Sequence, residues 1–270
     1  MTGKDIGFVA ALVALAVFIW VRDLTWVSAA GDALPILAAL PIFVWLGKPW
    51  RFQKDSPPRS IAAIALAAAG FVVGVVTELT IVLALSWTWL LWTWLRSRLS
   101  SDSLPAVRKL LVLPLLAFPW ITLDGQWIGW CFRLSAAWAV AHLFALMGFG
   151  VVQNGTNLLV QGLPISVEAA CSGLNTLQSM LIAGSMLAFI FLGQQRNFWW
   201  NLPGLIALAW IANTVRIITL VVASLTISPE FSQGMFHTWG AWLVLVLMFL
   251  LCSALFAMQR ARPTPAATAA

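Results

Sequence analysis

Charged residues are scarce in this chain of 270 residues. They make up 9% of the sequence, as 15 basic and 9 acidic side chains, whereas 61% of the residues are hydrophobic. Soluble domains carry roughly 25% charged residues, and a water-soluble globule of this size cannot hide so much apolar surface. The composition therefore excludes a soluble enzyme, a secreted disulfide scaffold and a disordered chain, and it leaves a polytopic membrane protein.

Cysteine and histidine are also rare, with three and two residues respectively. Cys131, Cys171 and Cys252 are too few and too scattered for a disulfide framework or a zinc site. His142 and His237 lie far apart and match no metal-ligand motif. The sequence therefore predicts neither a metal nor another cofactor. The net charge of +6 does not indicate nucleic-acid binding, because Lys and Arg gather between apolar stretches, where they orient a protein in the lipid bilayer.

Long apolar stretches dominate what is present. A spanning helix needs about 20 mostly apolar residues, and eight stretches approach that length. They are residues 6–21, 33–47, 60–77, 79–95, 106–123, 172–193, 201–226 and 237–258. The third and fourth close a tight hairpin around Glu78, and the fifth contains Pro114 and Pro119, which a helix bundle tolerates when neighbours satisfy the freed carbonyls. The predicted fold is an all-α polytopic membrane protein with about eight transmembrane helices.

Basic clusters predict how these spans are oriented. The clusters are Lys48, Arg51, Lys54 and Arg59; Arg96, Arg98, Arg108 and Lys109; Arg196; and Arg260 and Arg262. Positive residues favour the cytoplasmic side, so both chain termini are expected in the cytoplasm and the tip at Glu78 outside. We expect a single integral membrane domain over 1–262 in the inner membrane. The small, polar tail 263–270 is expected to be disordered.

The segment 124–170 does not fit a simple alternation of spans, because it must begin and end on the outer side. Within it, residues 127–149 have helical spacing of their aromatic residues but are interrupted by Arg133 and His142. A helix lying in the outer interface fits this pattern. The alternative is a ninth span in which Arg133 faces neighbouring helices.

After that helix, residues 150–167 alternate polar and β-branched residues around Asn154-Gly155, which predicts a short β-hairpin on the outer surface. The chain thus divides into a five-span part over 1–123, the outer segment 124–170 and a three-span part over 171–258.

Cys171 stands at the predicted outer start of the sixth span. Unpaired backbone N–H groups and the positive end of the helix dipole ease ionisation of a thiol at such a position. Ser172 is small and leaves the sulfur accessible, and Asn175 and Gln178 follow on the same helix face. A polar stripe that enters a span faces a partner helix or a water-filled cavity. The plainer alternative is a buried cysteine that packs as a small hydrophobe.

Arg216 lies inside the apolar run of the seventh span, about 11 residues from its outer end. This corresponds to roughly 16 Å of helix. An unpaired guanidinium in that position costs about 2.5 kcal/mol or more, so a thiolate, carboxylate, ligand or water must compensate. Asn213 lies one turn earlier on the same face. The alternative is a structural arginine that binds backbone carbonyls of neighbouring helices.

His237 and Glu168 complete the polar set. His237 opens the eighth span at the outer face and can exchange protons near neutral pH; a satisfied surface histidine is the plainer interpretation. Glu168 precedes the cysteine by three residues and can pair with Arg216 or His237, or cap the start of the sixth span. Cys171, Arg216 and His237 thus come from three successive spans on one side, and nucleophile, charge stabiliser and base are the groups that acyl transfer requires.

These residues also carry a family resemblance. The stretch EAACSGLNTL, then NTVRI some 40 residues later and FHTWG about 20 residues after that, resembles the exosortase/archaeosortase family, most clearly over 150–258. The family's proposed catalytic Cys, Arg and His correspond to Cys171, Arg216 and His237. Asn175 stands where the family more often carries a basic residue, which bears on the recognised motif more than on the chemistry.

The resemblance implies a multi-spanning cysteine transpeptidase. Its substrate would be a membrane-anchored protein with a carboxyl-terminal sorting signal, made of a short motif such as PEP, an apolar helix and a basic tail. Cleavage would occur on the periplasmic side through a thioester, with transfer to an acceptor and with polysaccharide-biosynthesis partners. Two other functions stay open on sequence grounds. One is a transporter or lipid-handling protein that binds an anionic substrate at Arg216, and the other is a non-catalytic subunit of an envelope polysaccharide complex.

Overall fold

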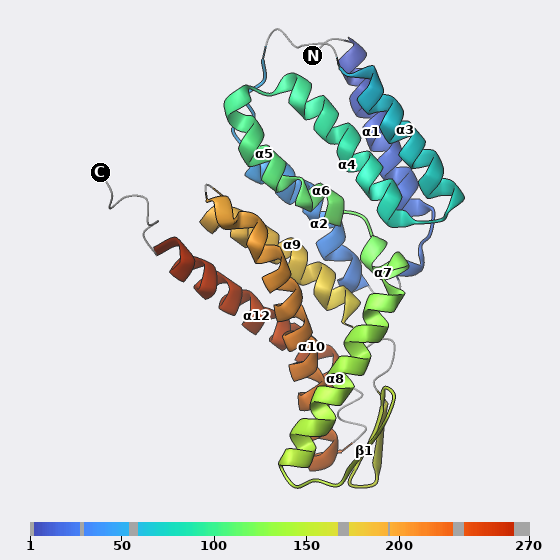
Figure 1. Cartoon of the computed structure of the whole chain (residues 1–270), viewed down its shortest axis with the longest axis vertical. Coiled ribbons are helices and arrows are strands. Elements are labelled where there is room, and N and C mark those ends of the chain that lie inside the picture. Colours follow the sequence, from blue (N-terminus) through green and yellow to red (C-terminus); the bar gives the residue numbers. More distant parts are fainter. Residues whose placement is uncertain are drawn as a thin grey trace. The chain divides into compact units, whose positions relative to one another are not determined.

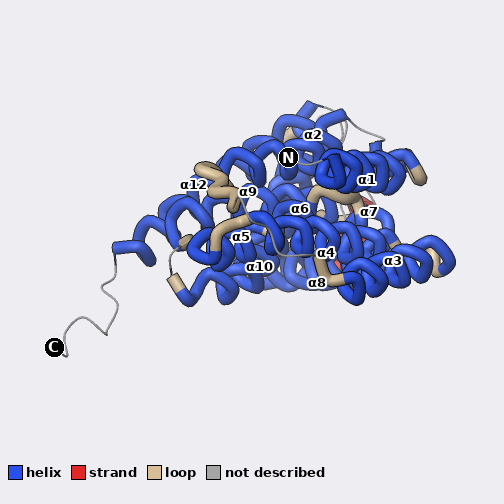
Figure 2. Tube along the Cα trace, turned by 90° about the horizontal axis from the view of Figure 1, so that it is seen from above, coloured by secondary structure: helices blue, strands red, loops and turns tan. Residues whose placement is uncertain are grey.

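The structure of the chain is a computed structural model. It describes residues 3–27, 30–53, 59–166, 173–193, 195–228 and 235–261, although side chains at some of the ends of these ranges, including 235–242, are not described. The fold is mostly helical, as Figure 2 shows, and the described part of the chain has 79% helix and one small sheet.

Seven of the eight predicted stretches each correspond to one helix, and the helices are labelled in Figure 1. They are α1 (Gly3–Val21), α2 (Ala30–Leu46), α3 (Ile61–Val76), α4 (Thr80–Arg98), α5 (Leu104–Leu110), α6 (Val112–Leu116), α7 (Trp120–Asp124), α8 (Gln126–Leu146), α9 (Leu174–Leu192), α10 (Asn201–Thr226) and α12 (Met235–Ala261). Within the described ranges, α8, α9, α10 and α12 contain apolar segments long enough to cross a membrane, and α1, α2 and α3 are shorter apolar helices. A total of eight spans stays a prediction.

The fifth predicted stretch, 106–123, is not one helix. The chain there forms α5, α6 and α7 in succession. Pro114 lies within α6 and Pro119 just before α7, and neither can donate a backbone hydrogen bond. After Pro114 the chain closes a tight turn, in which the Ala117 N–H donates to the Pro114 carbonyl at 3.3 Å. A new helical bond then begins at Pro119, whose carbonyl accepts from the Leu123 N–H at 3.0 Å. The prolines therefore break this stretch rather than being accommodated in a continuous helix.

The chain forms two compact units. Unit 1 comprises Met1–Asp124 and Gly193–Trp199, and unit 2 comprises Gly125–Leu192 and Trp200–Ala270. In unit 1, α3 and α4 form the predicted hairpin, with Glu78 at a φ of 59° in its tip. The start of α4 has no cap from its own N-cap residue. The carboxylate of Asp124 accepts a hydrogen bond from the Ile81 backbone N–H at 2.6 Å instead, which satisfies one of the donors left over at a helix start.

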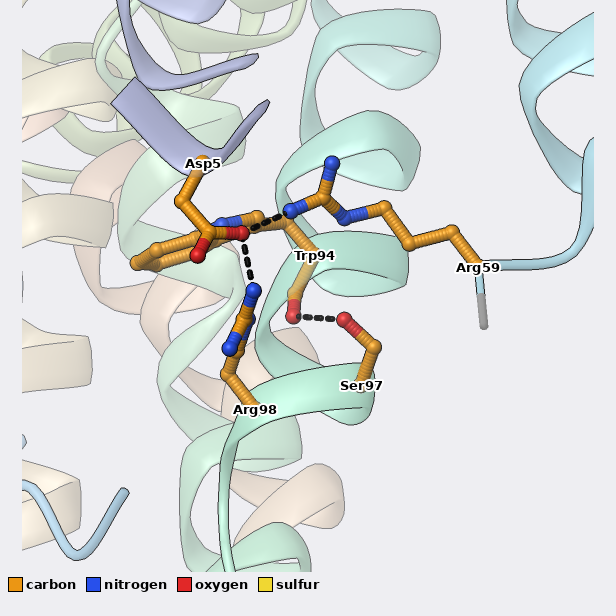
Figure 3. A network of polar contacts seen from close by, with 5 residues as sticks. All are labelled: Asp5, Arg59, Trp94, Ser97 and Arg98. Carbon is orange, nitrogen blue, oxygen red and sulfur yellow. Dashed lines mark hydrogen bonds and ion pairs between the residues drawn. The ribbon is translucent and has the colours of Figure 1, made fainter. Parts of the chain in front are cut away.

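A charge cluster brings the chain's amino-terminal helix to the basic loops of unit 1 (Figure 3). Asp5, only 1% exposed, pairs with both Arg59 and Arg98. The Arg59 guanidinium also lies 4.5 Å from the centre of the Phe8 ring. The starts of α1 and α3 and the end of α4 therefore share one end of unit 1, as the predicted orientation requires.

Unit 2 combines a helix bundle with the sheet. α9, α10 and α12 contact one another, and α8 contacts α10. The sheet is an antiparallel meander of β1 (Val151–Asn154), β2 (Asn157–Val160) and β3 (Leu163–Ser166), in the order β1-β2-β3. The predicted hairpin at Asn154-Gly155 is confirmed, with Asn154 opposite Asn157. The third strand was not predicted; it follows a second two-residue turn in which Gln161 and Gly162 both have positive φ.

One hydrophobic core joins the sheet to two helices. Buried residues of β2, α8 and α10 form it: Leu158, Val160, Ala136, Ala137, Val140, Ala141, Phe144, Ile217 and Val221. α8 is helical over nearly the range predicted, and its length and apolar character allow a crossing. Its placement in the outer interface stays a prediction.

Candidate functional site

Gly173 brings the start of α9 against the middle of α10. Its φ is +75°, a conformation that L side chains avoid. A Cβ added at this position would lie 2.8 Å from Asn213 Cγ and 3.0 Å from Asn213 Nδ2. The Gly173 carbonyl accepts a hydrogen bond from the Leu177 N–H at 2.7 Å, which begins the helix. A glycine is therefore needed here for both backbone conformation and close approach.

A second glycine gives the direction of the two helices. A Cβ at Gly184 would lie 2.3 Å from Leu205 Cδ2. Gly173, just before α9, thus faces Asn213 of α10, and Gly184 within α9 faces Leu205. The two helices are therefore antiparallel. Glycines that admit a neighbouring helix in this way are typical of packing within membranes.

This packing changes the expected depth of Arg216. Measured along its own helix, the arginine lies roughly 16 Å from the outer end. The start of α9 lies beside Asn213, three residues before Arg216. Arg216 is therefore only about 4.5 Å further along α10 than the start of α9. The 19 residues of α9 cover about 28 Å, close to the thickness of the hydrocarbon layer. A span over α9 therefore places Arg216 at its end, while the rest of α10 continues to the sheet.

Polar residues of α10 gather on its buried face at this level. Asn213 is 1% exposed and Arg216 is 9% exposed, and Thr214 is also buried. On α9, Gln178 is buried whereas Asn175 is exposed. Of the two residues of the predicted polar stripe that the structure describes, Gln178 is therefore buried and Asn175 is exposed.

The remaining predicted residues are described only in part. Cys171, Ser172 and Glu168 lie outside the described residues. His237 belongs to α12, but its side chain is not described. α12 contacts both α9 and α10, so the helices that follow or carry the three predicted catalytic residues are mutual neighbours.

The charge balance of unit 2 limits which partners Arg216 can have. Glu168 and Glu230 are the acidic residues in the sequence of this unit, against Arg133, Arg216, Arg260 and Arg262. Both glutamates lie outside the described residues. On α8, Nε of Arg133 is buried without a hydrogen-bond partner among the residues that the structure describes. Any carboxylate of unit 2 that pairs with an arginine is therefore one of these two.

No group of three His, Cys, Asp or Glu side chains gathers within the described part of the chain. Cys252 is buried in α12 and Cys131 is half-buried in α8. Both thiols are free.

Sequence reasoning missed two features of the chain's polar architecture. Ser135 of α8 accepts a hydrogen bond from the Trp210 indole N–H at 2.8 Å and donates to the Cys131 carbonyl at 2.7 Å, so it ties α8 to α10. The second feature is Asp5, an acidic residue at the start of an apolar helix, which is a signal in itself. The sequence predicts only a topological role for Arg59 and Arg98, whereas in the structure both pair with Asp5.

Comparison with known proteins adds independent information. Neither curated proteins nor solved structures give a match. Among protein families, the transmembrane exosortase family matches residues 26–254, a range that contains most of both units. This match extends the motif resemblance, which was clear only over 150–258, to nearly the whole chain. The chain belongs to the transmembrane exosortase family.

Proposed function

We propose that the chain is a membrane cysteine transpeptidase that cleaves carboxyl-terminal sorting signals at the outer face of the inner membrane. One observation carries the proposal beyond family membership, namely the contact between Gly173 and Asn213. Two residues span at most about 7 Å of chain, which keeps Cys171 close to Gly173. One helical turn separates Asn213 from Arg216. The contact thus supports a shared site for the cysteine and the arginine.

Cys171 is the proposed nucleophile. It precedes the first residue of α9 by three positions, where the positive end of the helix dipole favours a thiolate over a thiol. Arg216 adds a fixed positive charge nearby, on a helix that α9 packs against. Both effects lower the free energy of the thiolate and support attack on a peptide carbonyl. Ser172 and Glu168, which are close to Cys171 in the sequence, are proposed as supporting residues.

In the proposed reaction, the Cys171 sulfur forms a bond to the scissile carbonyl carbon, and the carbonyl oxygen becomes an oxyanion beside Arg216. The C–N bond then breaks, and His237 gives the leaving amine the proton that it took from the thiol. The thioester that remains is attacked by an acceptor nucleophile, which releases the thiol. Asn213 and Asn175 are proposed to help position the peptide backbone.

The proposed substrate is a membrane-anchored protein with a carboxyl-terminal signal of short motif, apolar helix and basic tail. Cytoplasmic chain termini and a periplasmic site follow from the basic clusters. The shared end of unit 1 supports that orientation, because Asp5 lies with Arg59 and Arg98. Partners from envelope polysaccharide biosynthesis are proposed on family grounds.

The test is processing of a reporter that ends in a Pro-Glu-Pro motif, an apolar helix and a basic tail, produced together with the protein in a bacterial inner membrane. Cys171→Ala is expected to abolish the size shift of the reporter while leaving the protein inserted at its normal amount. Cys131→Ala and Cys252→Ala are matched controls, because both thiols are free and neither lies at a helix start. They should process the reporter like the parent protein.

Normal processing by Cys171→Ala would contradict the proposal and favour a transporter that uses Arg216 for an anionic substrate. A thiol probe gives a second readout. Cys171 should react faster than Cys131 or Cys252, and Arg216→Ala should remove most of that excess. Equal labelling of the three cysteines would argue for a non-catalytic subunit.

A further inference from the structure

The sheet of unit 2 is attached to the turn of α10 that carries Arg216. Leu158 and Val160 of β2 are buried in one core with Ile217 and Val221 of α10. Ile217 directly follows Arg216 in the chain. Because packed cores resist deformation, the sheet keeps a fixed position relative to the arginine backbone.

The two edges of the sheet differ in their surroundings. β1 and β2 contact α8, and Figure 1 shows the sheet beside the carboxyl-terminal half of that helix. β3 is the other edge strand. It ends at Ser166, five residues before Cys171. β3 is therefore the strand of the sheet that is nearest in sequence to the proposed nucleophile, and it is separated from β1 by β2.

The register shows which backbone groups point outward from β3. Val160 and Leu163 close the two-residue turn and are opposite each other, and such closing pairs share hydrogen bonds. Along an antiparallel pair, hydrogen-bonded and non-hydrogen-bonded positions alternate. Pro164, opposite Leu159, and Ser166, opposite Asn157, are therefore non-hydrogen-bonded positions, and their backbone groups face away from β2. Pro164 has no N–H to donate, so Ser166 supplies the outward N–H of this edge.

We propose that the outer edge of β3 binds the substrate peptide beside the scissile bond as an added strand. This inference rests on the proposed function and specifies how the substrate is held. The outward N–H and carbonyl of Ser166 and the carbonyl of Pro164 can form hydrogen bonds with an extended peptide backbone. Edge strands commonly bind peptides in this way. Five residues span at most about 17 Å, so the paired segment lies within about five residues of the scissile bond.

The exposed face of the sheet indicates which side chain fits beside Pro164. Val152, Leu159 and Pro164 lie opposite one another across the three strands. Val152 is 63% exposed and Leu159 is 42% exposed. An added strand continues such a row with its own residue, and cross-strand neighbours of like character stabilise each other. The substrate residue opposite Pro164 is therefore an apolar or proline residue rather than a charged one.

Ser166→Pro tests the backbone contact. The substitution removes the outward N–H and leaves the hydrogen bonds to β2 in place. Pro164 shows that this strand tolerates a proline at such an outward position. Loss of one backbone hydrogen bond should reduce reporter processing about three- to ten-fold, through a higher KM. Ser166→Ala keeps the N–H, so the difference between the two variants at this position isolates the backbone donor from the side chain. Gln153→Pro makes the same change on the outer edge of β1, since Gln153 pairs with Leu158 at an equivalent position, and it should process normally.

A cross-linking experiment separates binding from catalysis and from folding. In a Cys171→Ala background, Pro164→Cys is oxidised against single cysteines placed in turn along the reporter segment beside its motif. Cross-links at every second reporter position would support an added strand. Their absence, together with normal processing by Ser166→Pro, would overturn the docking proposal while leaving the cysteine mechanism intact. Processing by Cys171→Ala itself would instead overturn the mechanism.

Discussion

Substituting Gly173 with alanine is the sharpest structural test of the candidate site. The left-handed backbone conformation costs an L-residue about 1–2 kcal/mol. The new Cβ would also stand 2.8 Å from Asn213 Cγ, where ordinary contacts begin at 3.4 Å. Because Asn213 is 1% exposed, its side chain has little room to withdraw. The start of α9 must therefore move away from α10 by more than half an ångström.

Such a movement displaces the proposed nucleophile relative to Arg216. A misplacement of about 1 Å between reacting groups can cost about 100-fold in rate, and we expect Gly173→Ala to lose about that much processing of the reporter. Gly148→Ala is the matched control. Its φ is +87° and an added Cβ has nothing within 4 Å, so it introduces backbone strain without a collision.

Two measurements decide the outcome. The thermal midpoint in detergent should fall for both alanine variants, since both carry the left-handed strain. Reporter processing and Cys171 labelling should fall only for Gly173→Ala. If Gly173→Ala processes the reporter as well as Gly148→Ala does, the contact between α9 and α10 does not organise the site and the reasoning is refuted.

Four further predictions can be checked separately. Arg216→Ala should slow reporter processing by about 100- to 1,000-fold, as expected for loss of an oxyanion partner, and Arg216→Lys should recover part of it; equal rates would exclude that role. Asp5→Asn should destabilise the protein by about 3–5 kcal/mol, because two guanidiniums lose their buried carboxylate, whereas Asp102→Asn on the surface should change stability by less than about 0.5 kcal/mol; similar melting shifts would contradict this. Lys109→Met should speed proteolysis of the segment whose two carbonyls its ammonium binds at 2.7 and 2.8 Å, and unchanged cleavage would count against it. A reporter fused at Asn154 should read outside the cytoplasm, and a cytoplasmic signal there would overturn the predicted orientation.

The positions of the long helices were predictable because the length of each apolar stretch can be counted in the sequence. α9 and α10 begin and end within two residues of the predicted stretches 172–193 and 201–226. The hairpin near Asn154-Gly155 was predictable for a similar reason, since such residues favour a tight turn. Its two turn residues are Gly155 and Thr156, one position later than predicted, because Asn154 pairs with Asn157 at the end of β1. The third strand was less visible, because Pro164 argues against a strand unless its nitrogen faces an open edge.

Distances between elements were not predictable. Sequence spacing placed Arg216 deep in its own helix, yet its level is set by where α9 begins, and that depends on Gly173 meeting Asn213. A glycine that closely follows a proposed nucleophile is easily interpreted as giving access to substrate. Its packing role appears only when the opposing helix is known. The Asp5 cluster was hidden for the same reason, since its partners lie 54 and 93 residues away in the sequence.

The assignment of Gly193–Trp199 to unit 1 has a consequence for how the protein can be divided. This short segment lies between α9 and α10, both of which belong to unit 2. Lys109 of α5 binds its Gly193 and Gln195 carbonyls. A fragment that starts at residue 125 would therefore contain Gly193–Trp199 without Lys109, which binds it. The complementary fragment would lack a segment that packs within unit 1. Two coexpressed fragments should therefore associate only if Gly193–Trp199 of one fragment binds Lys109 of the other.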